Sequence, residues 1–277
     1  MANAVGVSAC VAFVVIIGSA AAAAPGDESG EPQQPARALP VPGEVFDFQG
    51  HTAFLIRPEA PAAAAPWVWY APTLPMYPGP EEQWMFERLT KAGIAIAGID
   101  VGESYGSPKG RAVYTAFYEY LVRNRGLSST PCLLARSRGG LMHYNWAVEH
   151  PDSVRAIAGI YPVCDVRSYP GLDTACAAYG MTAAELAAQL DAHNPVSRVE
   201  PLAKARVPIL HIHGDMDETV PIEANSAALA REYERFGGPM KLVVIKGRGH
   251  DMWPGWFQCR ELVDFVIAHA TEEKRDE

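Results

Sequence analysis

Positive charge is scarce in this sequence, which has 23 Lys and Arg residues against 32 Asp and Glu and a net charge of −9 over 277 residues. No stretch is rich in Lys and Arg, which argues against a protein whose main partner is nucleic acid or an anionic membrane surface. The chain also has no glycine-rich phosphate loop and no dinucleotide fingerprint, so we expect no cofactor. With 49% hydrophobic residues, the sequence predicts a globular protein with a large core.

Charged side chains are absent from residues 1–24, which contain the apolar run Val11–Ile17 and then five alanines at Ala20–Ala24. An apolar core followed by small residues is typical of a secretory signal, so residues 1–24 are predicted to be a signal peptide and the protein to be secreted or periplasmic. The segment lacks the usual Lys or Arg at its start, which leaves an uncleaved anchor or a core helix as alternatives. We expect contact with a membrane only if the segment is an anchor.

Residues 25–42 are rich in Pro, Gly, Glu and Gln and are interpreted as a flexible linker, so the folded domain is expected over residues 43–270. Its first segments, 45–48 and 52–57, predict an antiparallel hairpin. Beyond the hairpin, short apolar strands alternate with amphipathic helices. Strands are expected at 67–70, 94–100, 131–135, 154–161, 208–213 and 241–245, and helices at 80–92, 110–125, 138–149, 222–236 and 259–270.

This alternation predicts an α/β fold, with a mostly parallel central sheet, an antiparallel N-terminal hairpin and helices on both faces. Residues 162–206 interrupt the alternation and contain one clear helix, near residues 182–193. We interpret them as a short cap insertion over the carboxyl edge of the sheet. Reacting groups gather in the loops at that edge in sheets of this kind.

The segment Cys132–Gly140 runs from a predicted strand into a predicted helix through Ser137. A serine in such a sharp turn presents its hydroxyl above the sheet, and small residues two places before and after it let strand and helix approach closely. Ala135 and Gly139 occupy these positions, where the first is more usually glycine. Arginines on both sides of the serine, Arg136 and Arg138, are unusual.

Two further strand ends carry an acid and a histidine. His250 follows the last predicted strand, and an imidazole, which titrates near pH 6.5, can take a proton from a serine hydroxyl. The preceding strand ends in Gly214, followed by three acidic residues: Asp215, Asp217 and Glu218.

In chain order, Ser137, an acid and then His250 are arranged as in an α/β-hydrolase triad. The chain resembles the α/β-hydrolase superfamily over nearly all of residues 43–270, including the links 150–154 and 214–221. Within that superfamily it resembles serine esterases of the dienelactone hydrolase kind and the catalytic domain of prolyl oligopeptidases.

The resemblance implies a fold, a mechanism and roles. The acid is the third residue after the glycine, which selects Asp217, and that residue would orient His250. The backbone N–H of Arg138 and that of Thr73 or Leu74, since Pro72 has no N–H, would form the oxyanion hole. Arg138 locally resembles the arginine that follows the serine of glucuronoyl esterases. It would then polarise the carbonyl or bind an acidic substrate, and a salt bridge to Glu103 is the alternative.

Other residues near these strand ends have two interpretations, a binding role and a purely structural role. Glu103 and Tyr105 could contact substrate or form a turn, and Trp253 could line an acyl pocket with its neighbours or pack the last helix. His211 and His213 alternate on a strand and could ligate zinc with the nearby aspartates. The hydrolase pattern explains this segment without a metal, so we predict no metal site.

Cysteines are few, five in all, and Cys10 lies in the predicted signal. Cys164 and Cys176 are 12 positions apart in the insertion, and export favours oxidation, so a disulfide between them is predicted. Cys132 lies in a buried strand and is expected to be a free thiol.

Together these observations predict an exported serine hydrolase that cleaves carboxylic esters through an acyl-enzyme. The expected substrate is a small-molecule or carbohydrate ester, for example an acylated or uronate sugar. A serine peptidase resembling prolyl oligopeptidase and a non-catalytic binding module on the same fold are the alternatives.

Overall fold

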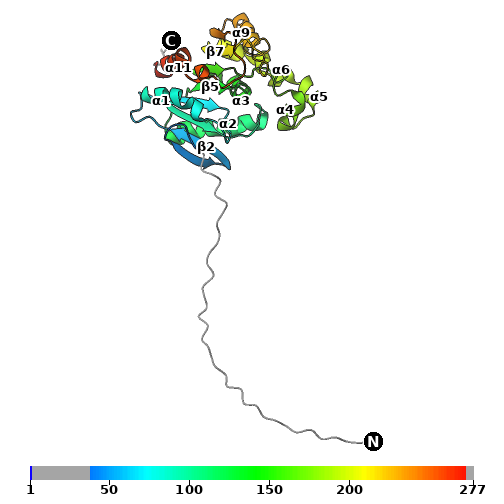
Figure 1. The fold of residues 1–277 in the computed structure, drawn as a ribbon, viewed down its shortest axis with the longest axis horizontal. Coiled ribbons are helices and arrows are strands. Elements are labelled where there is room, and N and C mark those ends of the chain that lie inside the picture. The colour runs from blue at the N-terminus through cyan, green and yellow to red at the C-terminus, as the bar shows by residue number, and fades with distance from the viewer. Residues whose placement is uncertain (2–37, 273–277) are drawn as a thin grey trace. The chain divides into compact units, whose positions relative to one another are not determined.

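The computed structural model describes Met1 and residues 38–272 (Figure 1). The predicted signal peptide, residues 1–24, and the predicted linker up to residue 37 therefore lie outside the described residues, apart from Met1. Among the helices of residues 38–272, none combines the length and apolar character that a membrane span needs.

The described residues build an eight-stranded sheet in the order β1-β2-β4-β3-β5-β6-β7-β8. Strands β1 and β2 form the predicted hairpin, β2 also pairs antiparallel with β4, and all other pairs are parallel. The strands are β1 (Glu44–Phe48), β2 (His51–Ile56), β3 (Trp67–Ala71), β4 (Ala95–Ile99), β5 (Cys132–Arg136), β6 (Ala156–Ile160), β7 (Ile209–Gly214) and β8 (Met240–Ile245). The predicted mostly parallel α/β-hydrolase sheet is confirmed.

Helices cover both faces of this sheet. Helices α1 and α11 pack together on one face, and α2, α3 and α9 cover the other (Figure 1). The helices are α1 (Gln83–Lys91), α2 (Pro108–Arg125), α3 (Gly139–Ala147), α4 (Leu172–Tyr179), α5 (Ala183–Ala188), α6 (Leu190–His193), α7 (Pro195–Arg198), α8 (Glu200–Lys204), α9 (Ser226–Arg235), α10 (Pro254–Phe257) and α11 (Arg260–Thr271).

Alternation of side chains along the central strands produces two cores, one on each face. In β3, Trp67 and Trp69 point into the cluster under α2 and α3, whereas Val68 and Tyr70 point into the cluster under α1 and α11. Every residue of β3, β4, β5, β6 and β7 is buried, because strands covered on both faces are apolar throughout. The carboxyl ends of the parallel strands therefore meet at one rigid edge.

The insertion after β6 is divided into five short helices, α4 to α8, instead of the one helix expected near residues 182–193. Gly180 ends α4 with a left-handed φ of 68°, and Pro195 and Pro201 lie in the first turns of α7 and α8. Proline fits a first turn but not a helix interior, because it lacks an N–H. These breaks explain the short helices.

The predicted disulfide between Cys164 and Cys176 is not formed, and both thiols are free. Cys164 is buried in the sheet core, with Sγ 3.6 Å from the Pro162 carbonyl oxygen. Cys176 packs instead against the separate cluster of the insertion, on α4. The two side chains thus belong to different parts of the core, which their spacing in the sequence cannot show. Cys132 is a buried free thiol, as expected.

Candidate functional site

A sharp turn between β5 and α3 presents Ser137 at the carboxyl edge of the sheet. Ser137 has a left-handed φ of 49°, which costs a non-glycine residue about 1–2 kcal/mol. Its N–H donates to the Ile160 carbonyl at 3.0 Å, and its carbonyl accepts from the Val163 N–H at 2.8 Å. Gly139 permits close packing, since a Cβ there would lie 2.2 Å from the Ala71 carbonyl oxygen. The turn therefore has the strand-turn-helix geometry expected from the sequence.

Two distant loops bring a histidine and a carboxylate to this serine. Ser137 Oγ lies 2.9 Å from Nε2 of His250, which follows β8. Nδ1 of His250 lies 2.8 Å from Oδ2 of Asp217, which follows β7. Because a carboxylate only accepts, His250 donates its Nδ1–H to Asp217, and its Nε2 is left to accept the Ser137 O–H. The structure thus brings together the three residues that the sequence singled out.

The Asp217 carboxylate is buried and held on both oxygens. Oδ1 accepts from the N–H groups of Thr219 and Val220, at 3.1 and 2.7 Å. Oδ2 faces His250 and, at 3.4 Å, Nε2 of His213. Burial alone would raise the pKa of Asp217, but hydrogen bonds from the two histidines and from the Val220 N–H hold it well below its usual range. Asp217 is therefore an anion throughout the neutral pH range.

Close contact between the loops after β7 and β8 explains the glycine at the end of β7. A Cβ on Gly214 would lie 2.1 Å from the Arg248 carbonyl oxygen. Asp215 ties the same loops together from the outside, where its Oδ1 accepts from the Gly247 N–H at 2.6 Å. Asp215 thus has a structural contact, and the acid that faces the histidine is Asp217.

A pocket of about 230 Å³ opens beside Ser137. That volume is below the roughly 300–1,000 Å³ usual for pockets that enclose drug-sized ligands, so the pocket fits a small group. Its lining comes from the ends of β3, β5 and β6 and from the loops after β3 and β8. The lining residues are Pro72, Tyr77, Arg136, Ser137, Arg138, Tyr161, His250, Asp251 and Met252.

Arg136 forms a buried wall of this pocket. Its Nη1 lies 2.7 Å from Oε1 of Glu82, which is fully buried. The guanidinium carbon is 4.4 and 4.8 Å from the ring centroids of Tyr77 and Phe257, and Nη2 lies 3.0 Å from Sδ of Met252. Because Glu82 neutralises Arg136, this wall is polar but adds no net charge.

Tyr161 packs against the histidine from the end of β6. Its ring centroid lies 4.3 Å from that of His250, and its hydroxyl donates to the Asp251 carbonyl at 3.4 Å. Burial, partly opposed by Arg136, raises the pKa of Tyr161 to about 12. The hydroxyl is therefore neutral at physiological pH and keeps its proton for donation.

The oxyanion donors predicted on the loop after β3 are not at the pocket. Thr73 pairs with Asp100 as an isolated β-bridge, and its hydroxyl donates to the Tyr70 carbonyl. The Leu74 N–H donates to the Tyr77 carbonyl at 3.1 Å, so it is occupied. Neither Thr73 nor Leu74 lines the pocket, whereas Tyr77 does. The sequence contained no signal for Tyr77, which reaches the pocket because the loop folds back on itself.

Arg138 lines the pocket at the start of α3, while its guanidinium forms an ion pair with Glu103. This is the alternative that the sequence left open. The Arg138 guanidinium carbon lies 5.9 Å from the Tyr169 ring centroid. Both members of the pair are partly exposed, so we expect it to add about 0–1 kcal/mol to stability. Glu103, which was predicted to bind substrate, pairs with Arg138 and does not itself line the pocket.

The other two residues predicted to bind substrate, Tyr105 and Trp253, do not line the pocket either. Tyr105 is buried in the core of the insertion, and its carbonyl accepts from the Tyr179 hydroxyl at 2.7 Å. Trp253 packs edge-on against Trp256, with ring centroids 5.5 Å apart, and under the Arg248 guanidinium. Both side chains therefore have packing roles. Met252 is the member of this aromatic segment that reaches the pocket.

The His211-x-His213 pair has protein partners on all four ring nitrogens. Both rings contact the Ser226 hydroxyl, and Tyr144 and Val220 supply the remaining hydrogen-bond partners. Within residues 38–272, no group of three or more potential metal ligands is present.

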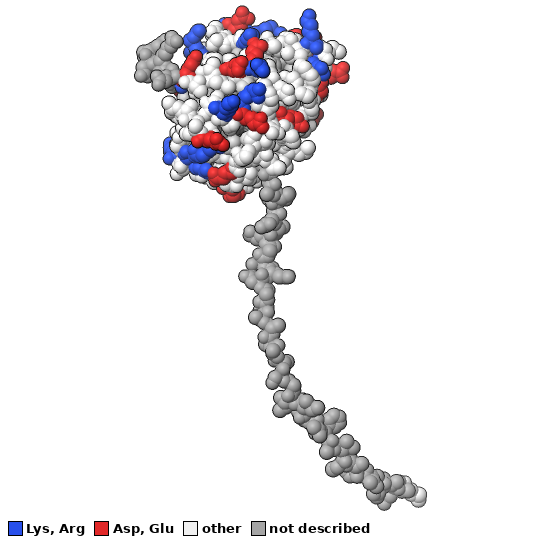
Figure 2. Space-filling view, turned by 60° about the vertical axis from the view of Figure 1, so that its left-hand side comes forward, with Lys and Arg blue, Asp and Glu red and all other residues white. Residues whose placement is uncertain are grey.

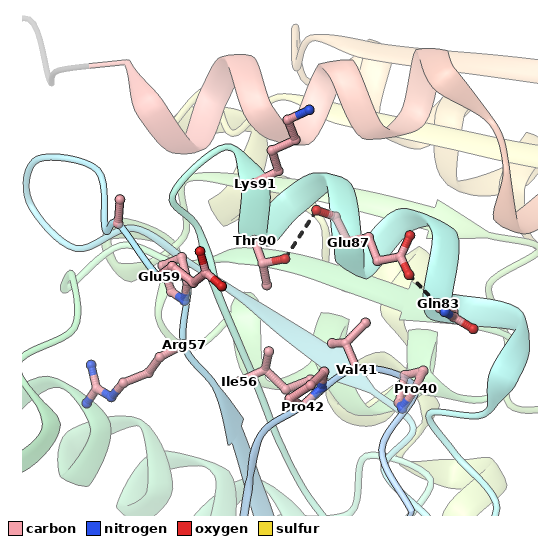
Figure 3. A pocket seen from close by; sticks show the side chains of 12 residues that line it. Pro40, Val41, Pro42, Ile56, Arg57, Glu59, Gln83, Glu87, Thr90 and Lys91 are labelled. Carbon is pink, nitrogen blue, oxygen red and sulfur yellow. Dashed lines mark hydrogen bonds between the residues drawn. The ribbon is translucent and has the colours of Figure 1, made fainter.

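A separate groove lies between residues 40–42, the end of β2 and α1 (Figure 3). Its exposed wall includes Gln83, which donates to Glu87 at 2.8 Å, and Thr90, which donates to the Glu87 carbonyl at 3.2 Å. No residue of the serine pocket lines it. On the face shown in Figure 2, acidic and basic side chains are interspersed without a patch of one sign.

Several solved structures share this fold at low sequence identity. Porphyromonas gingivalis dipeptidyl peptidase 4 superposes with a TM-score of 0.65 at 15% identity, over 82% of this chain and 35% of that chain. Est1E from Butyrivibrio proteoclasticus superposes with a TM-score of 0.58 at 20% identity, over 83% of this chain and 99% of that chain. An S-formylglutathione hydrolase from Agrobacterium tumefaciens superposes with a TM-score of 0.63 at 15% identity, over 82% of this chain and 93% of that chain. The chain thus spans about a third of the length of the dipeptidyl peptidase.

No curated protein matches the sequence. The prolyl oligopeptidase family, peptidase family S9, matches residues 114–270, which is more than half of the chain and includes the turn at Ser137 and the loops of Asp217 and His250. Together with the α/β-hydrolase sheet described above, this match shows that the chain belongs to the prolyl oligopeptidase family.

Proposed function

We propose that the protein hydrolyses small carboxylic esters with Ser137 as nucleophile, His250 as general base and Asp217 as its orienting acid. The observation that carries the proposal is the chain of contacts from Ser137 Oγ through the imidazole to the buried carboxylate, at 2.9 and 2.8 Å, beside an open pocket. A serine is a weak nucleophile unless a base removes its proton during attack, and this contact supplies that base.

The chemistry follows from the donor directions. Ser137 Oγ attacks the acyl carbon while its proton passes to Nε2 of His250, and Asp217 stabilises the imidazolium. The bond to the alkoxide then breaks, and His250 gives its proton to the alkoxide, which leaves as an alcohol. The acyl group remains on Ser137 as an ester. Water attacks this ester by the same route and releases the acid.

The oxyanion needs donors that are in place before the reaction. The first donor in the proposal is the backbone N–H of Arg138, the residue after the nucleophile. The backbone hydrogen bonds of the turn are donated by the N–H groups of Ser137, Gly140 and Leu141, so the Arg138 N–H is not used in them. The second donor in the proposal is the hydroxyl of Tyr77, which lines the same pocket.

The pocket favours a small, neutral acyl ester. Both arginines beside the serine are paired with carboxylates, Arg136 with Glu82 and Arg138 with Glu103, so neither presents an unpaired charge to an anion. Because a uronate ester is itself neutral, acylated carbohydrates and uronate esters are both compatible with a site that has no unpaired cation. One structural neighbour that the chain covers almost completely is an S-formylglutathione hydrolase, which agrees with a small acyl group. Export by residues 1–24 remains part of the proposal.

Peptide hydrolysis is the second candidate, because the matching family is that of prolyl oligopeptidase. A panel of nitrophenyl esters of graded acyl length, acetylated and methyl-uronate sugars and peptide anilides separates the two functions. We expect turnover of acetyl and other short acyl esters, and little turnover of anilides. Faster hydrolysis of anilides would replace the esterase proposal by the peptidase one. Absence of labelling by a fluorophosphonate would contradict both.

Replacing Asp217 by Asn tests the assignment of the acid. Because a neutral amide cannot stabilise an imidazolium as a carboxylate does, we expect kcat to fall by roughly 10³–10⁴-fold. Asp215→Asn is the matched control, since the Asp215 carboxylate contacts the Gly247 N–H and not the histidine, and its kcat should stay within about 3-fold. Steady-state kinetics on a nitrophenyl ester measures both. A larger loss in Asp215→Asn would show that the acid is assigned to the wrong residue.

A further inference from the structure

Behind Asp217, four buried side chains form a continuous row of hydrogen bonds. His211 and His213 alternate on β7 and therefore face the same side of the sheet. The Ser226 hydroxyl, at the start of α9, lies 2.9 Å from Nδ1 of His211 and 2.8 Å from Nδ1 of His213. The Tyr144 hydroxyl lies 2.7 Å from Nε2 of His211. All four are essentially inaccessible to solvent, so their partners are those within the row.

The end of the row at Asp217 determines the direction of its hydrogen bonds. Nε2 of His213 lies 2.8 Å from the Val220 carbonyl oxygen and 3.4 Å from Oδ2 of Asp217. Both oxygens can only accept, so this nitrogen carries a hydrogen. In a neutral imidazole the other nitrogen is then an acceptor, and the Ser226 hydroxyl donates to it.

The hydrogen bonds at the other end of the row can all run in the same direction. The Ser226 oxygen, having donated its hydrogen, accepts the Nδ1–H of His211, and Nε2 of His211 accepts the Tyr144 O–H. Burial, and to a lesser degree His213, lower the pKa of His211 to about 3, which agrees with a neutral ring. The reverse direction would require a cationic His213, and a buried cation beside Asp217 would compete with His250 for its charge.

We propose that this row, Tyr144–His211–Ser226–His213, is a positioning device that holds Oδ2 of Asp217 in the orientation that receives the Nδ1–H of His250. His213 and Ser226 are positioning residues and touch no reacting atom. The inference rests on the proposed function, since it assigns Asp217 a catalytic partner. It also gives the His-x-His pair a role other than metal binding. No proton needs to travel along the row, because the fixed direction of the donors is sufficient.

Ser226→Ala removes the middle of the row with little change in volume. We expect kcat to fall roughly 10-fold to 100-fold, since small displacements of catalytic groups have effects of this size, while KM stays within about 2-fold because no substrate contact is lost. Labelling of Ser137 by a fluorophosphonate should slow in parallel. Tyr144→Phe, at the far end, should lower kcat by less than Ser226→Ala.

Ser107→Ala is the matched control. Ser107 is a buried serine whose hydroxyl accepts from the Gly110 N–H at the start of α2, away from the serine pocket. Loss of this cap should lower the melting temperature by a few degrees and leave kcat per folded molecule unchanged. It therefore shows what destabilisation alone does to the assay.

A second pair of variants keeps the test decisive if Ser226→Ala folds poorly. In His213→Gln the side-chain amide can replace Nε2 as donor to the Val220 carbonyl beside Asp217, whereas the shorter side chain of His213→Asn cannot reach it. The Gln variant should retain at least about 5-fold more kcat than the Asn variant. If all variants of the row keep wild-type kcat per folded molecule while Ser137→Ala is inactive, the row has no positioning role and the proposed function stands. If wild-type protein fails to react with a fluorophosphonate, the proposed function itself is wrong.

Discussion

Replacing Ser137 by Ala is expected to lower kcat by roughly 10⁴–10⁶-fold, the loss seen when the nucleophile of a serine hydrolase triad is removed. This corresponds to about 5–8 kcal/mol of barrier. The serine supplies the bond to the acyl carbon, and its Oγ is the hydroxyl that lies 2.9 Å from Nε2 of His250. Steady-state turnover of a short-chain nitrophenyl ester, with folding checked by circular dichroism, measures the effect.

The backbone of Ser137 allows a control that separates strain from chemistry. With φ of 49°, alanine at this position keeps the strained conformation, whereas glycine relieves it. Ser137→Gly should therefore be as inactive as Ser137→Ala but more stable than it by about 0.5–1 kcal/mol. Ser153→Ala, on the 3₁₀ turn Pro151–Ser153, should retain wild-type activity. An alanine variant with more than about a tenth of wild-type turnover would show that another group is the nucleophile.

Local sequence signals were sufficient for the strand ends that carry Ser137, Asp217 and His250. Each of these residues follows a short apolar strand, and strands of a parallel sheet share one carboxyl edge. The resemblance to α/β-hydrolases selected Asp217 over Asp215, as the third residue after Gly214, and Asp217 is the carboxylate that faces His250. The fold and the convergence of the three side chains could therefore be predicted without coordinates.

Residues that reach the pocket by loop geometry could not be predicted. Tyr77 lines it because the Leu74 and Tyr77 backbones pair with each other, a contact that no periodicity encodes. The sequence identifies Arg136 only as an unusual neighbour of the serine, because its partner Glu82 lies 54 positions away. The Leu74 N–H, an expected oxyanion donor, instead donates to the Tyr77 carbonyl in the same loop pairing. Long-range pairing of this kind depends on packing and has no local signature.

His250→Ala is the second change with a very large expected effect, again roughly 10⁴–10⁶-fold in kcat. The imidazole removes the Ser137 proton and later returns it to the alkoxide, so both halves of the reaction lose their proton carrier. The double variant Ser137→Ala with His250→Ala should be little worse than either single variant, because residues that act as one unit are not additive. His269→Ala on α11, where Nδ1 contacts the Phe265 carbonyl within the same helix, is the matched control.

Added imidazole distinguishes loss of the base from loss of structure in His250→Ala. The deleted ring leaves a space beside Ser137 and Tyr161, next to the open pocket. A free imidazole bound there can accept the serine proton, although it lacks the orientation that Asp217 imposes, so partial recovery of turnover that rises with imidazole concentration is expected. The same additive should leave Ser137→Ala inactive, because the nucleophile is absent. Recovery in Ser137→Ala would mean that imidazole itself attacks the ester, and a fully active His250→Ala would assign the base to another group.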